Sequence, residues 1–272
     1  MPEGDTIARA AAVLHEALSG HPVTRFVTTL AHLAREDDNR PIAGRTVEGC
    51  AAQGKHLLIT FSGDLVLRTH MRMHGSWHLY QPGEGWQRPA HAMRVVITTP
   101  SRVAVAFDVP DAEFVRGTAR ARTRALARLG PDLLAPEVSI PDVAVRILAE
   151  GDRPLGQVLL DQRVAAGIGN VYRSELLFLA RLHPDTRASS IGVDAATAIV
   201  EHAVGLLRRN ATAASRSRNT TGRSAPGEAL WVYNRTTRPC RRCGTAISSA
   251  ATGPDARRVY WCSVCQPAPR AD

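Results

Sequence analysis

The chain has 272 residues and a formal charge of +9, from 34 basic and 25 acidic side chains. Its hydrophobic content of 44% is ordinary for a globular protein, so the composition excludes wholesale disorder. No run approaches the roughly 18 apolar residues of a membrane helix, and the first residues do not resemble a signal peptide, so we expect a cytoplasmic protein.

The positive charge lies mostly in the last quarter of the chain. Residues 201–272 contain 12 arginines against 4 acidic residues, a net of +8, whereas residues 1–200 carry 22 basic against 21 acidic side chains. A basic C-terminal region of this kind favours a nucleic acid as partner. Of the 34 basic residues, only Lys55 is a lysine.

The hydrophobic pattern is first helical and then β-rich. Apolar residues at helical spacing predict a helix over about 6–18. From 23 to 108, short β-rich runs alternate with turn residues, which predicts a succession of β-hairpins and hence a sandwich or a barrel. The clearest hairpins pair 56–61 with 65–69 and 94–99 with 103–108.

The pattern becomes helical again beyond Gly130. The predicted helices span 141–150, 154–161, 171–181 and 194–209. The change from β-rich to helical sequence predicts an α+β protein of more than one domain, with a boundary near 120–135.

Four cysteines near the C-terminus have the spacing of a structural zinc site. They form two Cys-x2-Cys pairs, Cys240 with Cys243 and Cys262 with Cys265, separated by eighteen residues. Each pair can turn two thiolates toward one tetrahedral ion, and four protein ligands leave no open position for chemistry. In a reducing compartment one zinc ion is favoured over disulfides, with redox-active or unliganded cysteines as the weaker alternative. Cys50 stands alone and is expected to be a small buried hydrophobe.

Arginines surround these cysteines, and a rigid zinc hairpin would hold them for contact with nucleic acid. The six are Arg235, Arg238, Arg241, Arg242, Arg257 and Arg258. A solvated basic face without a partner is the alternative, because the whole sequence prefers arginine to lysine.

The N-terminus offers a possible nucleophile. By position alone, Pro2 is a helix-entry residue. Removal of Met1 would expose its secondary amine, and an α-amine has a pKa of about 8. Attack by such an amine on a sugar aldehyde carbon gives a cationic iminium, which accepts electrons during elimination. Glu3 beside it could supply the protons.

Three further features suggest contact with a phosphate backbone or a base stack. Lys55 opens a strand where an arginine would serve for charge alone, so it is a candidate proton donor. Asn170 follows a Gly-rich turn as a candidate helix N-cap and could bind phosphate, although a plain helix-packing element is equally consistent. Met73, in Arg72-Met73-His74, could wedge into a base stack, although a methionine in a loop more often only packs.

These motifs occur together in one known family. The sequence resembles the formamidopyrimidine-DNA glycosylase/endonuclease VIII family in the order and spacing of five motifs: Met1-Pro2-Glu3-Gly4, Gly54-Lys55, Gly130-Pro131-Asp132, Leu160-Asp161-Gln162 with Gly167-Ile168-Gly169-Asn170, and the four-cysteine finger ending in Gln266. The resemblance spans roughly residues 1–266. Gly4 and Arg72-Met73-His74 look more like the endonuclease VIII branch, especially its actinobacterial members.

The resemblance implies a multi-domain α+β fold with three parts. These are an N-terminal catalytic β-sandwich with a flanking helix over 1–125, a helix-two-turn-helix DNA-binding domain over 126–230, and a zinc finger over 231–272. It also implies a nucleoid-associated monomer with one structural zinc ion and no small-molecule cofactor. Its partner would be damaged DNA.

The resemblance further implies a bifunctional DNA glycosylase and abasic-site lyase of base excision repair, acting on oxidised bases and foremost on pyrimidines. Pro2 would displace the base through a Schiff base, Glu3 would supply protons, and Lys55 would donate a proton during β-elimination. Arg257 would bind phosphates and assist δ-elimination, with Arg258 as the competitor for that role.

The remaining implied residues contact DNA without taking part in the chemistry. Arg72, Arg128 and Asn170 fall at DNA-binding positions of the family, and Met73 would fill the space left by an extruded nucleotide. One position departs from the family, because many members carry Glu where this chain has Thr6. Either Asp5 substitutes for it or base release is tuned differently.

Two other functions remain open at this point. One is an 8-oxoguanine/formamidopyrimidine-specific glycosylase of the same family, which changes the substrate and keeps the mechanism. The other is a non-catalytic zinc-finger DNA-binding module, against which the presence of Pro2, Glu3 and Lys55 argues.

Overall fold

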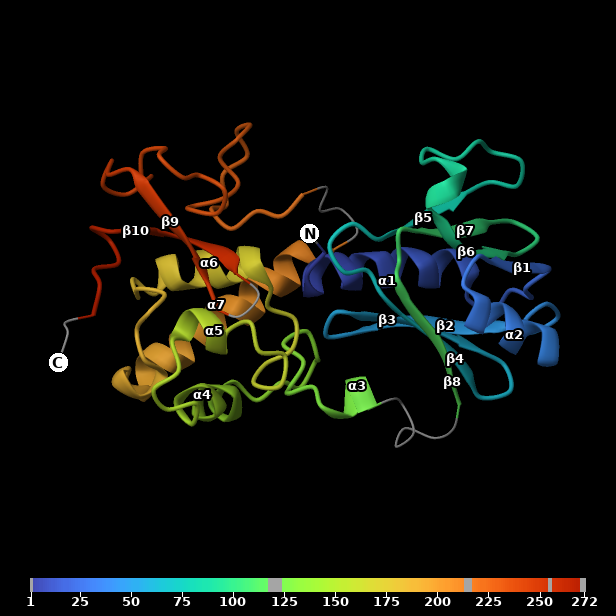
Figure 1. Cartoon of the computed structure of the whole chain (residues 1–272), viewed down its shortest axis with the longest axis horizontal. Coiled ribbons are helices and arrows are strands. Elements are labelled where there is room, and N and C mark those ends of the chain that lie inside the picture. The colour runs from blue at the N-terminus through green and yellow to red at the C-terminus, as the bar shows by residue number, and fades with distance from the viewer. Residues whose placement is uncertain (1, 117–123, 213–216, 254–255, 270–272) are drawn as a thin grey trace. The chain divides into compact units, whose positions relative to one another are not determined.

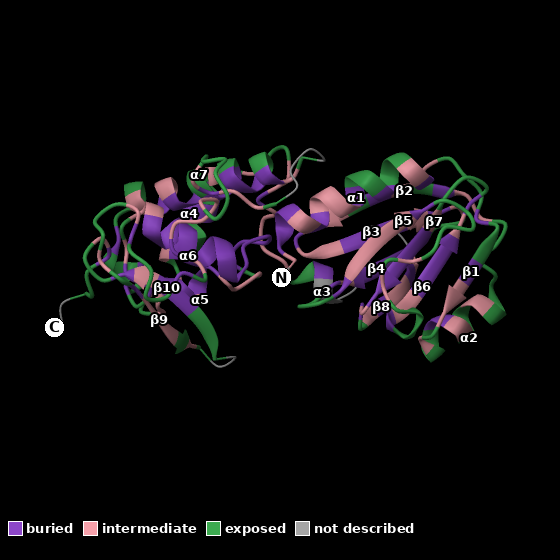
Figure 2. Cartoon of the chain, turned by 90° about the horizontal axis from the view of Figure 1, so that it is seen from above, coloured by how far each residue is buried: buried purple, intermediate pink, exposed green. Residues whose placement is uncertain are grey.

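The structure is a computed structural model that describes residues 2–116, 124–212, 217–253 and 256–269. The chain divides into two compact units, residues 1–128 and 129–272, each with its own hydrophobic core. Figure 1 shows the elements of both units, and Figure 2 shows which of their faces are buried. No helix in the described ranges is both long and apolar enough to cross a bilayer.

The first unit is a β-sandwich with a flanking helix, as predicted. One antiparallel sheet has the strand order β1-β6-β7-β5 and the other β2-β3-β4-β8. The strands are β1 (Arg25–Thr28), β2 (Val47–Gln53), β3 (His56–Phe61), β4 (Leu65–His70), β5 (Ser76–Tyr80), β6 (Met93–Thr98), β7 (Val103–Phe107) and β8 (Asp111–Arg116). Both predicted hairpins are present, as β3 with β4 and β6 with β7.

Helices complete the first unit. Helix α1 (Gly4–Leu18) packs against β2 and β3 through a stripe of buried residues, Ile7, Ala11, Leu14 and Leu18, which follows the helical period. Helix α2 (Ala31–Asn39) packs on β1 and β8, and the short α3 (Arg124–Ala127) follows the sandwich in the chain. Helix α1 therefore packs on the sheet whose turn between β2 and β3 carries Lys55.

The second unit combines a helical core with a two-stranded hairpin. Its helices are α4 (Ile140–Leu148), α5 (Leu155–Val158), α6 (Asn170–Leu179) and α7 (Val193–Asn210), and its strands are β9 (Ile247–Thr252) and β10 (Arg257–Cys262). The hairpin has its own small core, which includes Phe178 of α6. The predicted helix-two-turn-helix region and cysteine-bearing hairpin are thus both present.

One predicted helix is much shorter than expected. The sequence predicts a helix over 154–161, but α5 ends at Val158. The chain turns instead at Asp161, whose Oδ1 accepts the main-chain N–H of Arg163 at 3.0 Å. Before this turn, the N–H groups of Leu160 and Asp161 already bond three residues back, to Gln157 and Val158, so the α-helical pattern does not continue.

Candidate active site and metal centre

Glu3 and Asp5 are fixed at the beginning of α1. Glu3 is the N-cap residue, and its carbonyl accepts the N–H groups of Thr6 at 2.9 Å and Ile7 at 3.0 Å. The side chains of Glu3 and Asp5 are fully buried, whereas Pro2 is half-buried. Thr6 Oγ1 donates to Asp5 Oδ1 at 3.3 Å. Two buried acids, Glu3 and Asp5, thus lie within three residues of Pro2 in the chain, at the end of the helix where its dipole favours carboxylates.

Lys55 lies in the tight turn between β2 and β3, the two strands on which α1 packs. Gln53 pairs with His56, which leaves Gly54 and Lys55 as the turn, and Gly54 adopts a φ of 56°. This left-handed conformation suits glycine. Lys55 is half-buried. The single lysine is thus held by a short, defined turn and not by a long loop.

Two neutral histidines lie beside Lys55. His56 and His70 are cross-strand partners, with ring centroids 4.9 Å apart. Burial lowers the pKa of His56 to about 3 and that of His70 to about 4, with nearby positive charges adding to the effect. Each Nδ1 faces a donor: Arg68 Nη1 at 2.9 Å for His56 and the N–H of Arg72 at 3.2 Å for His70. Both rings therefore carry their proton on Nε2 at neutral pH.

The predicted wedge lies at the tip of the loop that joins β4 to β5. Met73 is 53% exposed, which is unusual for a large apolar side chain. Arg72 before it has a φ of 50°, and its Nε donates to Asp111 Oδ2 at 2.6 Å. A hollow of about 370 Å³ lies beside the loop, lined by residues that include Arg72, Met73 and His74.

In the second unit, Asn170 lies against the hairpin. Asn170 Nδ2 donates to the carbonyl of Arg258 at 3.0 Å, and Asn170 Oδ1 accepts from the buried guanidinium of Arg173. Arg173 also donates to the carbonyl of Arg257 at 3.2 Å. The structure therefore brings two predicted site residues, Asn170 and Arg257, together through Arg173, which the sequence reasoning missed.

The predicted capping role of Asn170 is wrong. Helix α6 begins at Asn170 itself, and Gly169 is the N-cap residue, with no side-chain capping bond. The amide of Asn170 is already used in bonds to Arg173 and the hairpin, so it does not cap the helix. In the sequence, the bond between Asn170 and Arg173 is signalled only by their spacing of three residues, which places them one helical turn apart.

The two arginines at the start of β10 are both exposed, but their surroundings differ. Arg258 Nη1 donates to Ser249 Oγ of the hairpin at 3.0 Å. Arg257 borders a hollow of about 330 Å³ in the second unit, which Arg153, Arg163 and Arg173 also line. Arg128, the last predicted DNA contact, is exposed just after α3.

Three of the six arginines near the cysteines donate to main-chain carbonyls. Arg235 is buried and donates to the carbonyls of Trp231 and Pro239. Arg241 donates to two carbonyls of the preceding segment, and Arg242 donates to the carbonyl of Phe178 with its guanidinium 4.3 Å from that ring. Carbonyl acceptors and an aromatic face satisfy these guanidiniums. The expectation that all six contact nucleic acid stays a prediction. Arg235 is buried, whereas Arg242 remains exposed.

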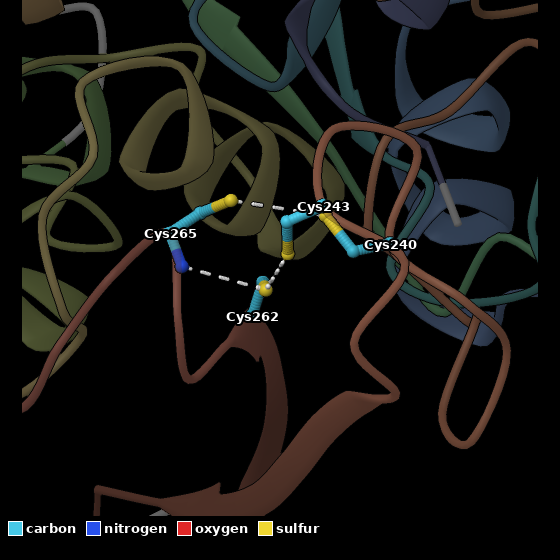
Figure 3. A group of neighbouring side chains, drawn as sticks. All are labelled: Cys240, Cys243, Cys262 and Cys265. Atoms are coloured by element: carbon cyan, nitrogen blue, oxygen red, sulfur yellow. Dashed lines mark hydrogen bonds between the residues drawn. The ribbon is translucent and has the colours of Figure 1, made fainter.

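The four cysteines form a cluster that fits one metal ion (Figure 3). Their Sγ atoms all lie within 4.8 Å of one another, with 3.4 Å between Cys243 and Cys262 and 3.9 Å between Cys240 and Cys265. Sulfur ligands at about 2.3 Å from a tetrahedral zinc ion are about 3.8 Å apart. Main-chain N–H groups also point at Sγ of Cys240 and Cys262. The donor set and its spacing suit a structural zinc ion.

A second residue that the sequence reasoning missed is Glu175 of α6. Its carboxylate is fully buried and accepts the main-chain N–H groups of Trp231, Val232 and Tyr233 at 2.8–2.9 Å, together with the hydroxyl of Thr220. It ties the segment that leads into the cysteine hairpin to α6. A glutamate in an apolar helix is the only sign of this role in the sequence.

Comparison with known proteins gives the family. Residues 1–111 match the formamidopyrimidine-DNA glycosylase N-terminal domain, and residues 129–221 match the formamidopyrimidine-DNA glycosylase H2TH domain. The chain is 42% identical to "Probable endonuclease 8 2" of Streptomyces coelicolor, over 99% of this chain and 96% of that protein. It is 38% identical to "DNA-(apurinic or apyrimidinic site) lyase Nei2" of Mycolicibacterium smegmatis, over 98% of this chain and 100% of that protein.

The fold agrees with solved structures. A Lactococcus lactis formamidopyrimidine-DNA glycosylase in complex with DNA that contains an abasic site superimposes with a TM-score of 0.83 at 19% identity, over 98% of this chain and 100% of that chain. The identity over nearly full length, the two matched domains and the cysteine hairpin agree. The chain therefore belongs to the formamidopyrimidine-DNA glycosylase family.

Proposed function

We propose that the chain is an endonuclease VIII-like DNA glycosylase and abasic-site lyase of base excision repair that removes oxidised bases, foremost pyrimidines. The observation that carries this proposal is the start of α1, where Pro2 is followed by buried carboxylates at Glu3 and Asp5. A non-catalytic DNA-binding module has no need of buried acids beside an N-terminal amine. Relatives that span the whole chain are named endonuclease or lyase, which favours the enzyme.

In the proposed reaction, the amine of Pro2 forms a bond to C1′ of the damaged nucleotide. The bond from C1′ to the base breaks, and the base leaves with its electron pair and takes up a proton. Glu3 protonates the ring oxygen O4′ as the sugar opens, which leaves an iminium between Pro2 and C1′. Both groups lie at the first turn of α1, where the helix dipole also favours an anionic phosphate.

Strand cleavage follows from the iminium. Loss of a proton from C2′ sends electrons toward the iminium and breaks the bond from C3′ to its oxygen, and the 3′ phosphate leaves. In a second elimination, C4′ loses a proton and the bond from C5′ to its oxygen breaks, which releases the other phosphate. Water then hydrolyses the iminium and frees Pro2. Lys55 is proposed to donate protons here, because a lysine ammonium can lose a proton where a guanidinium cannot.

Contacts in the second unit are proposed to bind the DNA backbone. Arg257 is the stronger candidate for the phosphates around the lesion, because it borders the arginine-lined hollow, whereas Arg258 is bonded to Ser249. Arg72, Arg128 and Asn170 are proposed as further contacts. The zinc ion would be held by the four cysteines and would supply no chemistry beyond fixing the hairpin.

Thr6 bears on the first step of the reaction. Thr6 stands where many family members have a glutamate, but the neighbouring Asp5 supplies a buried carboxylate in the first turn of α1. The hydroxyl of Thr6 donates to that carboxylate. We propose that Asp5 takes over the part of the family glutamate in base release.

Borohydride trapping on oligonucleotides tests the proposal. The probes carry one lesion each: an oxidised pyrimidine, 8-oxoguanine or an abasic site. We expect a covalent protein–DNA adduct, strongest with the pyrimidine and abasic probes, and its loss in Pro2→Gly or with a blocked N-terminus. Stronger trapping on 8-oxoguanine would favour the alternative glycosylase. Undiminished trapping in both altered proteins would overturn the nucleophile, and no trapping in the native protein would favour a binding module.

A further inference from the structure

The loop that carries Met73 is held in one conformation by the strands around it. Gly75 N donates to the carbonyl of Met71 at 2.9 Å, which closes the loop at its base. A Cβ on Gly75 would lie 2.5 Å from the carbonyl oxygen of Met71 and 3.0 Å from that of Asp108, so only glycine fits. The backbone of the loop thus lies directly on the segment between β7 and β8.

Two arginine–aspartate pairs support the loop from its two sides. On one side, Arg72 binds Asp111 at 2.6 Å. On the other side, Arg88 Nη1 donates to the carbonyl of His74 at 3.2 Å, and Arg88 Nη2 binds Asp108 at 2.5 Å. Met73 stands between these two anchored residues.

Arg88 is itself well supported. Its Nη1 also donates to Ser76 Oγ at 3.1 Å, and its guanidinium lies 5.8 Å from the ring centroid of Phe107. Its side chain is 31% exposed and that of Asp108 is 33% exposed, so the pair is partly shielded from water. The fork of an arginine reaches the carbonyl and the carboxylate at once, which a single ammonium does not do.

We propose that Arg88 and Asp108 are positioning residues that hold the loop of residues 71–75 in an ordered conformation before DNA binds. Met73 then enters the base stack without a separate ordering step. The inference rests on the proposed function and on the role that the family resemblance implies for Met73, which is to fill the space left by an extruded nucleotide. An apolar wedge must displace stacked bases, and a loop that is already ordered loses less conformational freedom at that step. Neither residue contacts the reacting atoms.

The proposal separates two substrates. A lesion in duplex DNA requires the wedge, whereas a preformed abasic site in a single strand offers the sugar without unstacking. Arg88→Met keeps the packing on Phe107 and removes the fork. We expect it to slow single-turnover excision from the duplex on the order of tenfold, and to leave cleavage of the single-stranded abasic site within about twofold of the native rate.

Fluorescence of 2-aminopurine beside the lesion reports the unstacking directly. We expect a slower rise in Arg88→Met and in the nearly isosteric Asp108→Asn. Arg102→Met, on the turn between β6 and β7, is the matched control and should behave as the native protein. Thermal unfolding of each variant checks that it is folded.

The outcomes distinguish this inference from the proposed function. If Met73→Ala leaves duplex excision and fluorescence unchanged, Met73 is not a wedge, and both proposals about the loop fail. If Met73→Ala slows them but Arg88→Met and Asp108→Asn do not, the positioning role alone is overturned. An equal loss on duplex and single-stranded substrates would also overturn it, because that pattern reflects general damage to the fold.

Discussion

The buried carboxylate of Glu175 gives the sharpest test of how the cysteine hairpin is held. It accepts three consecutive main-chain N–H groups, of residues 231–233, and the hydroxyl of Thr220. These donors belong to the segment that precedes the hairpin, whereas Glu175 belongs to α6. We expect Glu175→Gln to loosen this segment while it preserves the shape of the side chain.

The magnitude follows from the donors. Glutamine offers one acceptor oxygen, so its NH2 group must face either the N–H of Trp231 and the hydroxyl of Thr220 or the N–H groups of Val232 and Tyr233. A buried donor left without an acceptor costs about 1–3 kcal/mol, and the surviving bonds lose roughly half their strength with the charge. We expect the free energy of unfolding to fall by about 3–5 kcal/mol.

Chemical and thermal unfolding measure this loss. At about 2–4 °C per kcal/mol for a chain of this size, the melting temperature should fall by roughly 6–20 °C. Glu201→Gln on the exposed face of α7 is the matched control and should change it little. A loss below about 1 kcal/mol in Glu175→Gln would refute the reasoning, because the three main-chain bonds could not then depend on the charge.

Four other predictions follow from the site and its surroundings. Burial lowers the pKa of His56 to about 3 and of His70 to about 4, so on acidification the unfolded chain takes up protons first. The free energy of unfolding should therefore fall from pH about 6.5 toward about 4, by roughly 1–2 kcal/mol since both rings are partly exposed, and less in His70→Gln; urea titrations at each pH measure it. Lys55→Arg should keep DNA affinity and slow strand cleavage by roughly 10²-fold or more, and cleavage within about twofold of native would contradict its proton role. Chelation of the expected zinc ion should free the cysteine thiolates, which then take up protons, and should abolish DNA binding. Thiol titration and a mobility-shift assay measure the two effects, and unchanged binding would contradict a structural metal. Arg238→Ala should reduce the salt dependence of DNA binding without changing the melting temperature, whereas Arg242→Ala should lower the unfolding free energy by about 1 kcal/mol and leave the salt slope.

Much of the fold can be predicted because its periodicities are local. The stripe of α1 and the hairpins of β3 with β4 and of β6 with β7 are each readable within about fifteen residues of sequence. The end of α5 could not be predicted from periodicity, because the N–H groups of Leu160 and Asp161 bond three residues back instead of four, and the spacing of apolar residues does not reveal that change. Periodicity alone did not distinguish a sandwich from a barrel; the family resemblance implied the sandwich, and the strand order confirms it.

The candidate site could be predicted where the residue type carries the meaning. Two Cys-x2-Cys pairs and the single lysine stand out in any count of the sequence. Arg173 and Glu175 do not, because an arginine and a glutamate on a helix are ordinarily solvated. Their role appears only when residues about 55–85 positions later in the chain place carbonyl and N–H groups against them.

The same contrast changes what the basic C-terminal region means. An excess of arginine in a sequence is a count of charges, whereas a field that attracts DNA depends on charges that face water. Arg235 and Arg241 donate to main-chain carbonyls, and Arg242, although exposed, donates to the carbonyl of Phe178 with its guanidinium over that ring, so these guanidiniums stabilise the hairpin. Their charge still adds to the long-range potential, but the contacts that release counterions fall to exposed groups such as Arg238 and Arg257. DNA affinity should therefore depend on fewer arginines than the composition indicates. Substitution of the other arginines should lower the free energy of unfolding instead.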